Sequence, residues 1–132
     1  MSQENVEAWE RAIQAFNDRD FERLVAEFAP GIEFRPLMTG MTGQPYRGRE
    51  GVREWLDAID ADWETFVTTV DRIEDHDEFV LAVGRLQGRG RASGVEVTRP
   101  SAYLARFENG KVVWWQTFAT REEALEAAGL SE

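Results

Sequence analysis

The chain has 132 residues, which suits one compact domain, and we expect a single domain over residues 1–132. It has no cysteine, which excludes disulfides and thiolate metal sites, and its net charge of -10 disfavours nucleic acids as partners. No apolar run approaches the roughly 20 residues of a membrane span, and the N-terminus does not resemble a signal peptide, so we expect a cytoplasmic protein without membrane association.

The first part of the chain predicts two helices and a strand. Over residues 3–17 apolar side chains recur at helical spacing, which indicates an amphipathic helix. Asp20 can cap a second, shorter helix, which Pro30 and Gly31 stop. Residues 32–38 then alternate between apolar and polar side chains, as in a strand, and Pro36 marks an edge or a bend.

The middle and end of the chain predict a loop, a helix and four strands. Residues 39–48 are rich in Gly and Thr and read as an ordered loop, without the lysine that a phosphate-binding loop needs. The next helix carries one apolar stripe that includes Trp55 and Trp63. From residue 65 onward the apolar period becomes two, which predicts strands within 65–74, 78–91, 94–107 and 111–118. Asn109-Gly110 is a strong signal for a hairpin between the last two.

A terminal helix completes the order of elements. Thr120 and Glu123 form a capping box for this helix, and Gly129 suits the left-handed residue that ends it. Helices early and strands late predict the α+β class, with the helices on one face of a curved sheet whose other face is solvated or covered by a partner. We expect three glycines to permit the sharp bend of the sheet: Gly84, Gly88 and Gly90.

This order, with the segments RAIQAFNDRDFERLVAEFAP, YRGREGVREWL and LARFENGKVVWWQTFATREEALEAAGL, resembles the SnoaL-like branch of the NTF2-like superfamily, which includes the ketosteroid isomerase-like fold. The resemblance spans nearly the whole chain. It implies a cone in which a strongly curved, mostly antiparallel sheet wraps around N-terminal helices and leaves a pocket at the open end, commonly in a homodimer. It does not fix a function, because this superfamily contains isomerases, cyclases, epoxide hydrolases, dehydratases and non-enzymatic binding proteins.

The carboxylates that the known enzymes of this kind use have no counterpart here. The resemblance places Ala12, Arg35 and Tyr103 where ketosteroid isomerases have a tyrosine, an aspartate base and a protonated aspartate. An arginine cannot abstract a proton at neutral pH, which argues against that mechanism. The late aspartate of the polyketide cyclases is missing from 111–119, and the Arg-x-Asp pair of the epoxide hydrolases is Arg99-Pro100-Ser101.

Alternation along the late strands predicts which side chains face the pocket. If Tyr103 points inward, Ser101 and Arg99 share its face. The isomerase match also turns Trp115 and Thr117 inward. We therefore expect the side chains of Arg99, Ser101, Trp115 and Thr117 to help bind a ligand. Three helix residues are expected to join them, with a plain core role as the alternative: Trp9, Phe16 and Trp55.

The same alternation turns Trp114 and Gln116 outward. A tryptophan exposed on a monomer would be an unfavourable apolar patch, so we expect a homodimer through the outer face of the sheet. The alternative is that Trp114 and Trp115 are both core residues, one under each layer that covers the sheet.

Three residues are candidates for chemistry: Arg35, Tyr103 and Glu33. An arginine that projects from the first strand into an aromatic cavity needs a carboxylate, and Glu33 lies two residues away on the same face. The alternatives are an ion pair at the rim, or an Arg35 that binds a carboxylate, enolate or carbonyl oxygen. The single histidine, His76, lies in a polar turn, and we expect neither a metal nor another cofactor.

The sequence therefore predicts a protein with an apolar pocket for a small organic ligand that carries a carbonyl or carboxylate. Three functions remain open. The first is an isomerase-type or cyclase-type enzyme that uses acid-base chemistry. The second is a binding domain without turnover, and the third is a dimeric scaffold whose cavity is filled by side chains.

Overall fold

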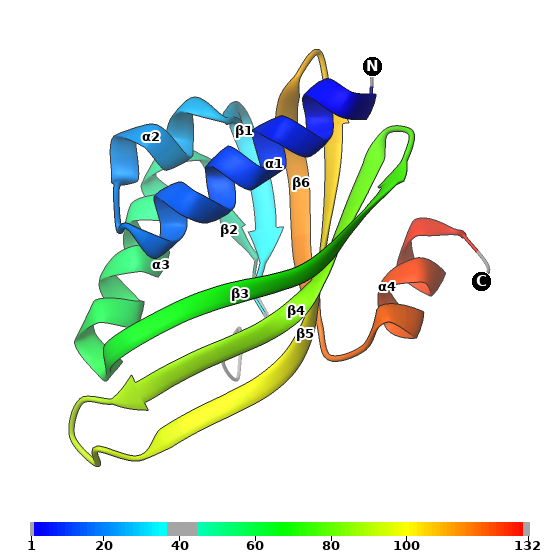
Figure 1. Cartoon of the computed structure of the whole chain (residues 1–132). Coiled ribbons are helices and arrows are strands. Elements are labelled where there is room, and N and C mark those ends of the chain that lie inside the picture. The colour runs from blue at the N-terminus through cyan, green and yellow to red at the C-terminus, as the bar shows by residue number, and fades with distance from the viewer. Residues whose placement is uncertain (1, 37–44, 131–132) are drawn as a thin grey trace.

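The computed structural model in Figure 1 describes residues 2–36 and 45–130. Its elements are α1 (Ser2–Asn17), α2 (Phe21–Ala26), β1 (Phe28–Arg35), β2 (Tyr46–Arg47), α3 (Gly48–Asp62), β3 (Trp63–His76), β4 (Phe79–Gly90), β5 (Glu96–Glu108), β6 (Lys111–Phe118) and α4 (Arg121–Ala128). The α+β class is confirmed, and the order of elements differs from the predicted one by the short strand β2. Trp63, predicted on the apolar stripe of the third helix, instead begins β3. The first strand begins at Phe28, earlier than predicted, and most of the loop expected at 39–48 lies outside the described residues.

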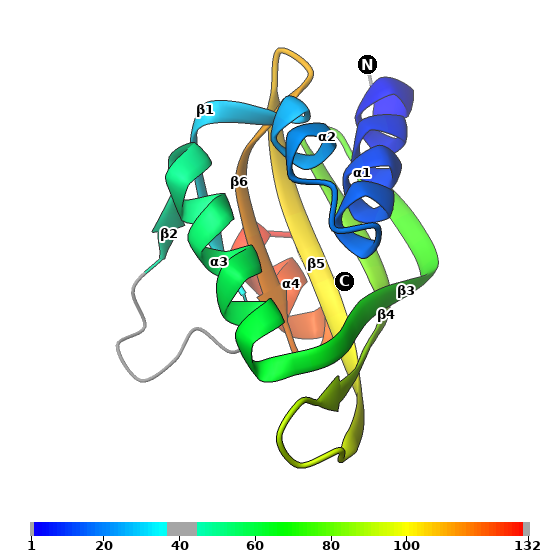
Figure 2. The ribbon, with the colours of Figure 1, turned by 90° about the vertical axis from the view of Figure 1, so that its left-hand side faces the viewer.

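The strands form one curved sheet in the order β2-β1-β6-β5-β4-β3. Among the strand pairs of the described residues, only β1–β6 is parallel, and the others are antiparallel. Figures 1 and 2 show the long strands β3, β4 and β5 sweeping around the side on which α1, α2 and α3 lie. The sheet that wraps around N-terminal helices is therefore the arrangement that the family resemblance implied.

Each face of the sheet packs against its own helices, because neighbouring strand residues point to opposite faces. The inner face contributes Tyr103 and Trp115 to the main core with α1, α2 and α3. The outer face contributes Leu104 and the half-buried Trp114 to a smaller core with Leu125 of α4. The expectation that all helices share one face is therefore wrong for α4, which already covers part of the outer face that the sequence analysis left to solvent or a partner.

Three predicted helix caps are confirmed, but Pro30 and Gly31 do not stop α2, which ends at Ala26; both lie within β1. The Asp20 side chain accepts a hydrogen bond from the backbone of Arg23 at the start of α2. Thr120 accepts one from the backbone of Glu123, and Gly129 ends α4 in the left-handed region with φ of 75°.

Gly84 lies where β3 and β4 come close together at an irregularity of the ladder between Val70 and Arg72. A Cβ atom at Gly84 would lie 1.9 Å from the backbone oxygen of Thr69, a distance at which atoms overlap. At Gly88 a Cβ atom would meet the Trp63 ring at 2.8 Å. A side chain at either position would therefore clash with the neighbouring strand or with the Trp63 ring, whereas the role of the glycines in bending the sheet stays a prediction.

Glu74 of β3 holds α4 on the outer face. Its carboxylate accepts two hydrogen bonds from Arg121, at 2.7 Å and 3.0 Å, and also pairs with Arg72 and His76. The hydrogen bond from Arg121 is the largest cause that lowers the pKa of Glu74 from 4.5 to about 2. This anchor was not foreseen. His76, predicted to lie in a polar turn, is instead the half-buried last residue of β3.

The described part of the chain shows two further features. None of its helices combines the length and the apolar character that crossing a bilayer requires. Its His, Asp and Glu side chains nowhere gather in threes with the geometry to hold a metal ion.

Candidate ligand-binding site

A cavity of about 510 Å³ lies between the inner face of the sheet and the helices α1 and α3. Its wall is mostly aromatic. It includes four of the five tryptophans, which are Trp9, Trp55, Trp63 and Trp115. Exposed lining residues near the end of α3 and in the β4–β5 turn, among them Asp62 and Ser93, place the mouth there.

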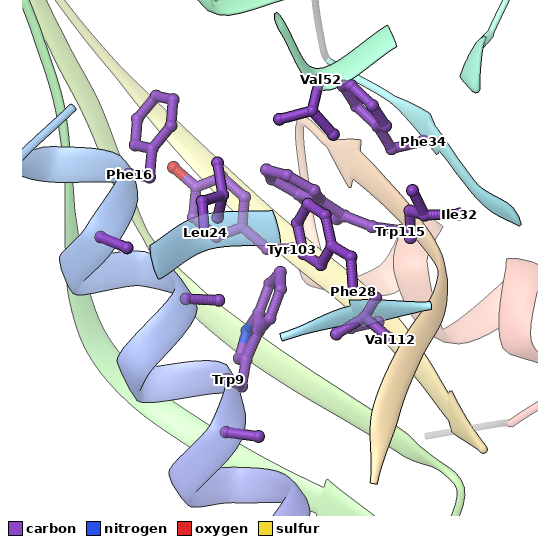
Figure 3. Packing of buried hydrophobic residues seen from close by; sticks show 14 of the residues in the cluster. Trp9, Phe16, Leu24, Phe28, Ile32, Phe34, Val52, Tyr103, Val112 and Trp115 are labelled. Atoms are coloured by element: carbon purple, nitrogen blue, oxygen red, sulfur yellow. The ribbon is translucent and has the colours of Figure 1, made fainter. Parts of the chain in front are cut away.

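The aromatic rings of the wall support one another by edge and stacking contacts. Trp115 meets Trp9 edge to face at a centroid distance of 5.3 Å and meets Trp55 in the same way at 5.1 Å. Phe16 stacks on Trp55 at 5.1 Å. Figure 3 shows Trp9 and Phe16 reaching from α1 toward the side on which Trp115 and Tyr103 project from the sheet. Rings fixed in this way form a rigid wall that suits a flat apolar molecule.

The polar part of the wall is a cluster of hydroxyl groups around Tyr103. Ser101 Oγ donates to the phenol oxygen at 2.7 Å, and the phenol is also hydrogen-bonded to Thr68 Oγ1. Thr68 Oγ1 in turn donates to the carbonyl of Arg85 at 3.3 Å. Because the Ser101 and Thr68 protons are used in this way, the phenol proton is the one shared with Thr68. Tyr103, Thr68 and Thr117 all line the cavity.

Burial raises the pKa of the Tyr103 phenol above its ordinary value, against the opposing effect of the hydrogen bonds with Ser101 and Thr68. The phenol is therefore protonated over the whole physiological range. A protonated phenol in an apolar cavity is a hydrogen-bond donor for a ligand oxygen and is not a base.

Asn17 at the end of α1 holds Thr68 in place. Its side-chain nitrogen donates to the Thr68 carbonyl and its side-chain oxygen accepts from the Thr68 backbone N–H, both at 2.9 Å. The sequence analysis missed this role. An Asn that follows a helical apolar stripe indicates only the end of a helix, and the strand that it contacts lies 51 residues further along the chain.

Two indole nitrogens in the same wall lack a hydrogen-bond acceptor within the described residues. They are Nε1 of Trp9, a residue with 1% of its surface exposed, and Nε1 of Trp115, with 8% exposed. Buried donors without an acceptor are uncommon in proteins.

Most predicted ligand-binding residues meet at this cavity. Trp9, Phe16, Trp55, Trp115 and Thr117 line it as expected, and so does Tyr103, one of the three candidates for chemistry. Ser101 is not among the lining residues, but its hydroxyl donates a hydrogen bond to the phenol oxygen of Tyr103.

Glu33 and Arg35 lie elsewhere. In the parallel pairing of β1 with β6, Phe34 is level with Trp115 and stacks on it at 5.7 Å, whereas Glu33 is level with Trp114 and Arg35 with Gln116. The two charged residues therefore share the outer face. The expectation that they project into the cavity is therefore wrong. The alternative of an ion pair is the one that the structure shows, although on the outer face and not at the cavity rim: Glu33 pairs with Arg35 at 3.4 Å and with Arg47 at 3.1 Å.

Arg99 faces inward as predicted, since it is level with Leu86 of the cavity wall, but it lies beyond the cavity in the exposed part of β5. Trp114 and Gln116 lie on the outer face, as expected, but Trp114 is half-buried and packs in the smaller core beneath α4, which agrees with the alternative of one core tryptophan under each layer. A homodimer through that face stays a prediction.

The sequence analysis also missed Asp62, the one carboxylate among the described residues that line the cavity. No pattern marked it, because it ends a helix whose polar side carries several acids.

The sequence profile of the SnoaL-like domain matches residues 9–115. The chain belongs to the SnoaL-like domain family. No curated protein matches the chain with significance. The fold of this SnoaL-like protein is shared by many solved structures.

One similar structure is an NTF2-like protein of unknown function from Burkholderia pseudomallei, with a TM-score of 0.81, 19% identity, and coverage of 93% of this chain and 95% of that one. Another is TerC, co-crystallised with polyporic acid, with a TM-score of 0.80, 18% identity, and coverage of 93% and 96%. A third is a protein with a ketosteroid isomerase-like fold from Catenulispora acidiphila, in complex with trimethylamine, with a TM-score of 0.75, 21% identity, and coverage of 98% and 95%. At these identities the likeness establishes the fold alone.

Proposed function

We propose that this SnoaL-like protein binds a small, largely aromatic molecule and orients it by a hydrogen bond from the Tyr103 phenol to a carbonyl or similar oxygen of the ligand. The observation that carries the proposal is the hydroxyl cluster around Tyr103 in a mostly apolar cavity of about 510 Å³. Small-molecule sites generally have this composition, with a few polar groups that set the orientation in an apolar pocket.

The hydroxyl cluster can change its hydrogen bonds without moving the backbone. The phenol proton is shared with Thr68, and a ligand oxygen beside Tyr103 can replace Thr68 as its acceptor, because hydroxyl protons rotate freely. Thr68 keeps its own acceptor, the Arg85 carbonyl, and Ser101 continues to donate to the phenol oxygen. A phenol that accepts one hydrogen bond donates the next more strongly.

The fold relatives support a role in binding small molecules. TerC was co-crystallised with polyporic acid, and the Catenulispora acidiphila protein was crystallised with trimethylamine. Since these relatives share only the fold, the ligand of this chain has to be identified from its own cavity.

A second candidate function is proton transfer on such a ligand, favoured by Asp62. This carboxylate lines the cavity near its mouth, whereas Glu33 and Arg35 lie on the other side of the sheet. A ligand carbonyl polarised by Tyr103 becomes more acidic at the neighbouring carbon, and Asp62 is the available base for that proton.

The binding proposal is tested with two probes that differ by one carbonyl group, benzophenone and diphenylmethane. Tryptophan emission reports the titration directly, because four of the five tryptophans line the cavity. We expect the wild type to bind benzophenone about fivefold more tightly than diphenylmethane, the effect of one neutral hydrogen bond. Tyr103→Phe should remove this preference and leave diphenylmethane binding unchanged.

Tyr46→Phe is the matched control, since Tyr46 also lines the cavity and its ring stacks on Phe34 at 5.2 Å. This variant should keep the preference for benzophenone. Equal affinities of the wild type for the two probes, or an equal loss in both tyrosine variants, would contradict the role of Tyr103. Failure of both probes to bind would refute the proposed function itself.

The second candidate function, proton transfer, is tested with Asp62→Asn, which should slow hydrogen–deuterium exchange at the carbon next to the carbonyl of a bound aryl ketone.

A further inference from the structure

A small slot of about 80 Å³ adjoins the main cavity at the end of the β4–β5 hairpin. The two spaces share Trp63, Phe66 and Leu86, which therefore form the partition between them. Beyond this partition the slot is lined by Gln87, Gly88, Val97 and Arg99. A molecule that fills the cavity and extends past the partition reaches the side chain of Arg99 next.

Arg99 stands apart from the other arginines of the same hairpin. Within residues 2–36 and 45–130 its guanidinium has neither a hydrogen bond nor an ion pair. The four others in residues 85–106 each have a partner: Asp71 for Arg85, Glu96 for Arg89, the backbone carbonyls of Asp60 and Trp63 for Arg91, and Glu108 for Arg106.

The strand register explains why this arginine faces the slot. Arg99 is level with Leu86 on β4, and Leu86 is level with Thr68 on β3, so all three project from the inner face. Gly88 adds to the slot, because the absence of a side chain there lets the Trp63 ring lie against the β4 backbone. The slot is therefore an apolar recess with one cation at its edge.

We infer that Arg99 and this slot bind an anionic end group, a carboxylate or sulfonate, of a ligand whose aromatic part occupies the main cavity. The inference rests on the proposed function and narrows its ligand to aromatic acids. A guanidinium pairs with such groups through two parallel hydrogen bonds, which a ring in the cavity would align. The slot has room for an end group of this kind.

The charge of the protein makes a local cation necessary. With a net charge of -10 the long-range field repels anions, so an acidic ligand needs a nearby positive group to bind. Residues 85–106 supply it, with five arginines and one acid, Glu96. Because Arg99 is exposed, its attraction for an anion should weaken as salt screens it.

The test uses two dyes with the same aromatic skeleton, the anionic anilinonaphthalene sulfonate and the neutral N-phenyl-naphthylamine, with energy transfer from the cavity tryptophans as the signal. Arg99→Gln should weaken binding of the sulfonate about fivefold, the range for a partly exposed ion pair, and leave the neutral dye within about twofold. Arg99→Lys should restore part of the loss. Arg89→Gln, which removes the same charge from the same hairpin, is the control and should leave both affinities within twofold.

Salt supplies an independent readout. Sulfonate binding should weaken with ionic strength in the wild type and in Arg89→Gln, and much less in Arg99→Gln. Equal losses for both dyes in Arg99→Gln, or equal losses of the sulfonate in Arg99→Gln and Arg89→Gln, would overturn the inference while the neutral dye still bound and supported the proposed function. If neither dye bound the wild type, the proposed function and this inference would fall together.

Discussion

Replacing Asn17 by Ala tests whether α1 positions the hydroxyl cluster. The change removes two hydrogen bonds of 2.9 Å and leaves the backbone N–H and C=O of Thr68 without side-chain partners in a part-buried setting. Each bond contributes about 1 kcal/mol net, and an unsatisfied group costs about 1–3 kcal/mol, so we expect Asn17→Ala to lower the free energy of unfolding by about 2–3 kcal/mol. Because Thr68 contacts the Tyr103 phenol, the benzophenone preference should shrink as well.

Urea denaturation followed by tryptophan emission measures the loss of stability. Gln14→Ala is the control, because Gln14 lies on the same helix and its side chain makes one exposed hydrogen bond, to Asp18 at 3.1 Å. This variant should change the free energy of unfolding by less than about 0.5 kcal/mol. Equal losses in the two variants would refute the role assigned to Asn17. A destabilised Asn17→Ala that kept the full benzophenone preference would show that Tyr103 is positioned without it.

Two further predictions concern the sheet. Glu74→Gln should lower the free energy of unfolding by about 1–2 kcal/mol at neutral pH, after allowance for solvent screening. The pKa of Glu74 is lowered from 4.5 to about 2 by Arg121, so its contribution is complete above pH 4.5 and is lost as the pH falls toward 2, where urea midpoints of variant and wild type should converge. Convergence already at neutral pH would contradict the anchor. Gly84→Ala should cost about 3 kcal/mol or more, because its Cβ would lie 1.9 Å from the Thr69 oxygen, whereas Gly31→Ala, with open space around it, should change little. Similar thermal midpoints for the two alanine variants would refute the close strand approach.

The sequence predicted the inward and outward faces of the late strands because their period is regular. Fixing Tyr103 as inward was enough to place Ser101 and Arg99 on its side, and the family resemblance placed Trp115 inward and Trp114 outward. The alternation predicts the face on which a side chain lies, but it does not predict how far along the strand the cavity extends. Arg99 shares the face of Tyr103 but lies four residues further toward the hairpin, past the partition of the cavity.

On the first strand the family resemblance misled, although the local pattern was informative. Ile32 and Phe34 are apolar and Glu33 and Arg35 are charged, so alternation alone turns the apolar pair toward the core, as the structure does. The match to an isomerase base position favoured the opposite orientation for Arg35. Alternation is the stronger argument where it conflicts with the isomerase match, because turning Arg35 inward would bury a charge at a large cost in free energy.

Other features depend on contacts between distant segments and carried no local signal. Leu125 and Ala124 make α4 amphipathic, but this pattern does not tell which face of the sheet the helix covers. The anchor between Glu74 and Arg121 settles it, and this pair is separated by 47 residues. The same holds for the amide contacts of Asn17.

The most direct test of the account is a crystal structure of the protein soaked with para-iodobenzophenone, located by the anomalous signal of iodine. The account predicts iodine inside the cavity bounded by Trp9, Trp55 and Trp115, with the ketone oxygen within hydrogen-bond distance of Tyr103 Oη. A cavity closed by side chains, or iodine bound only on the outer face of the sheet, would contradict it.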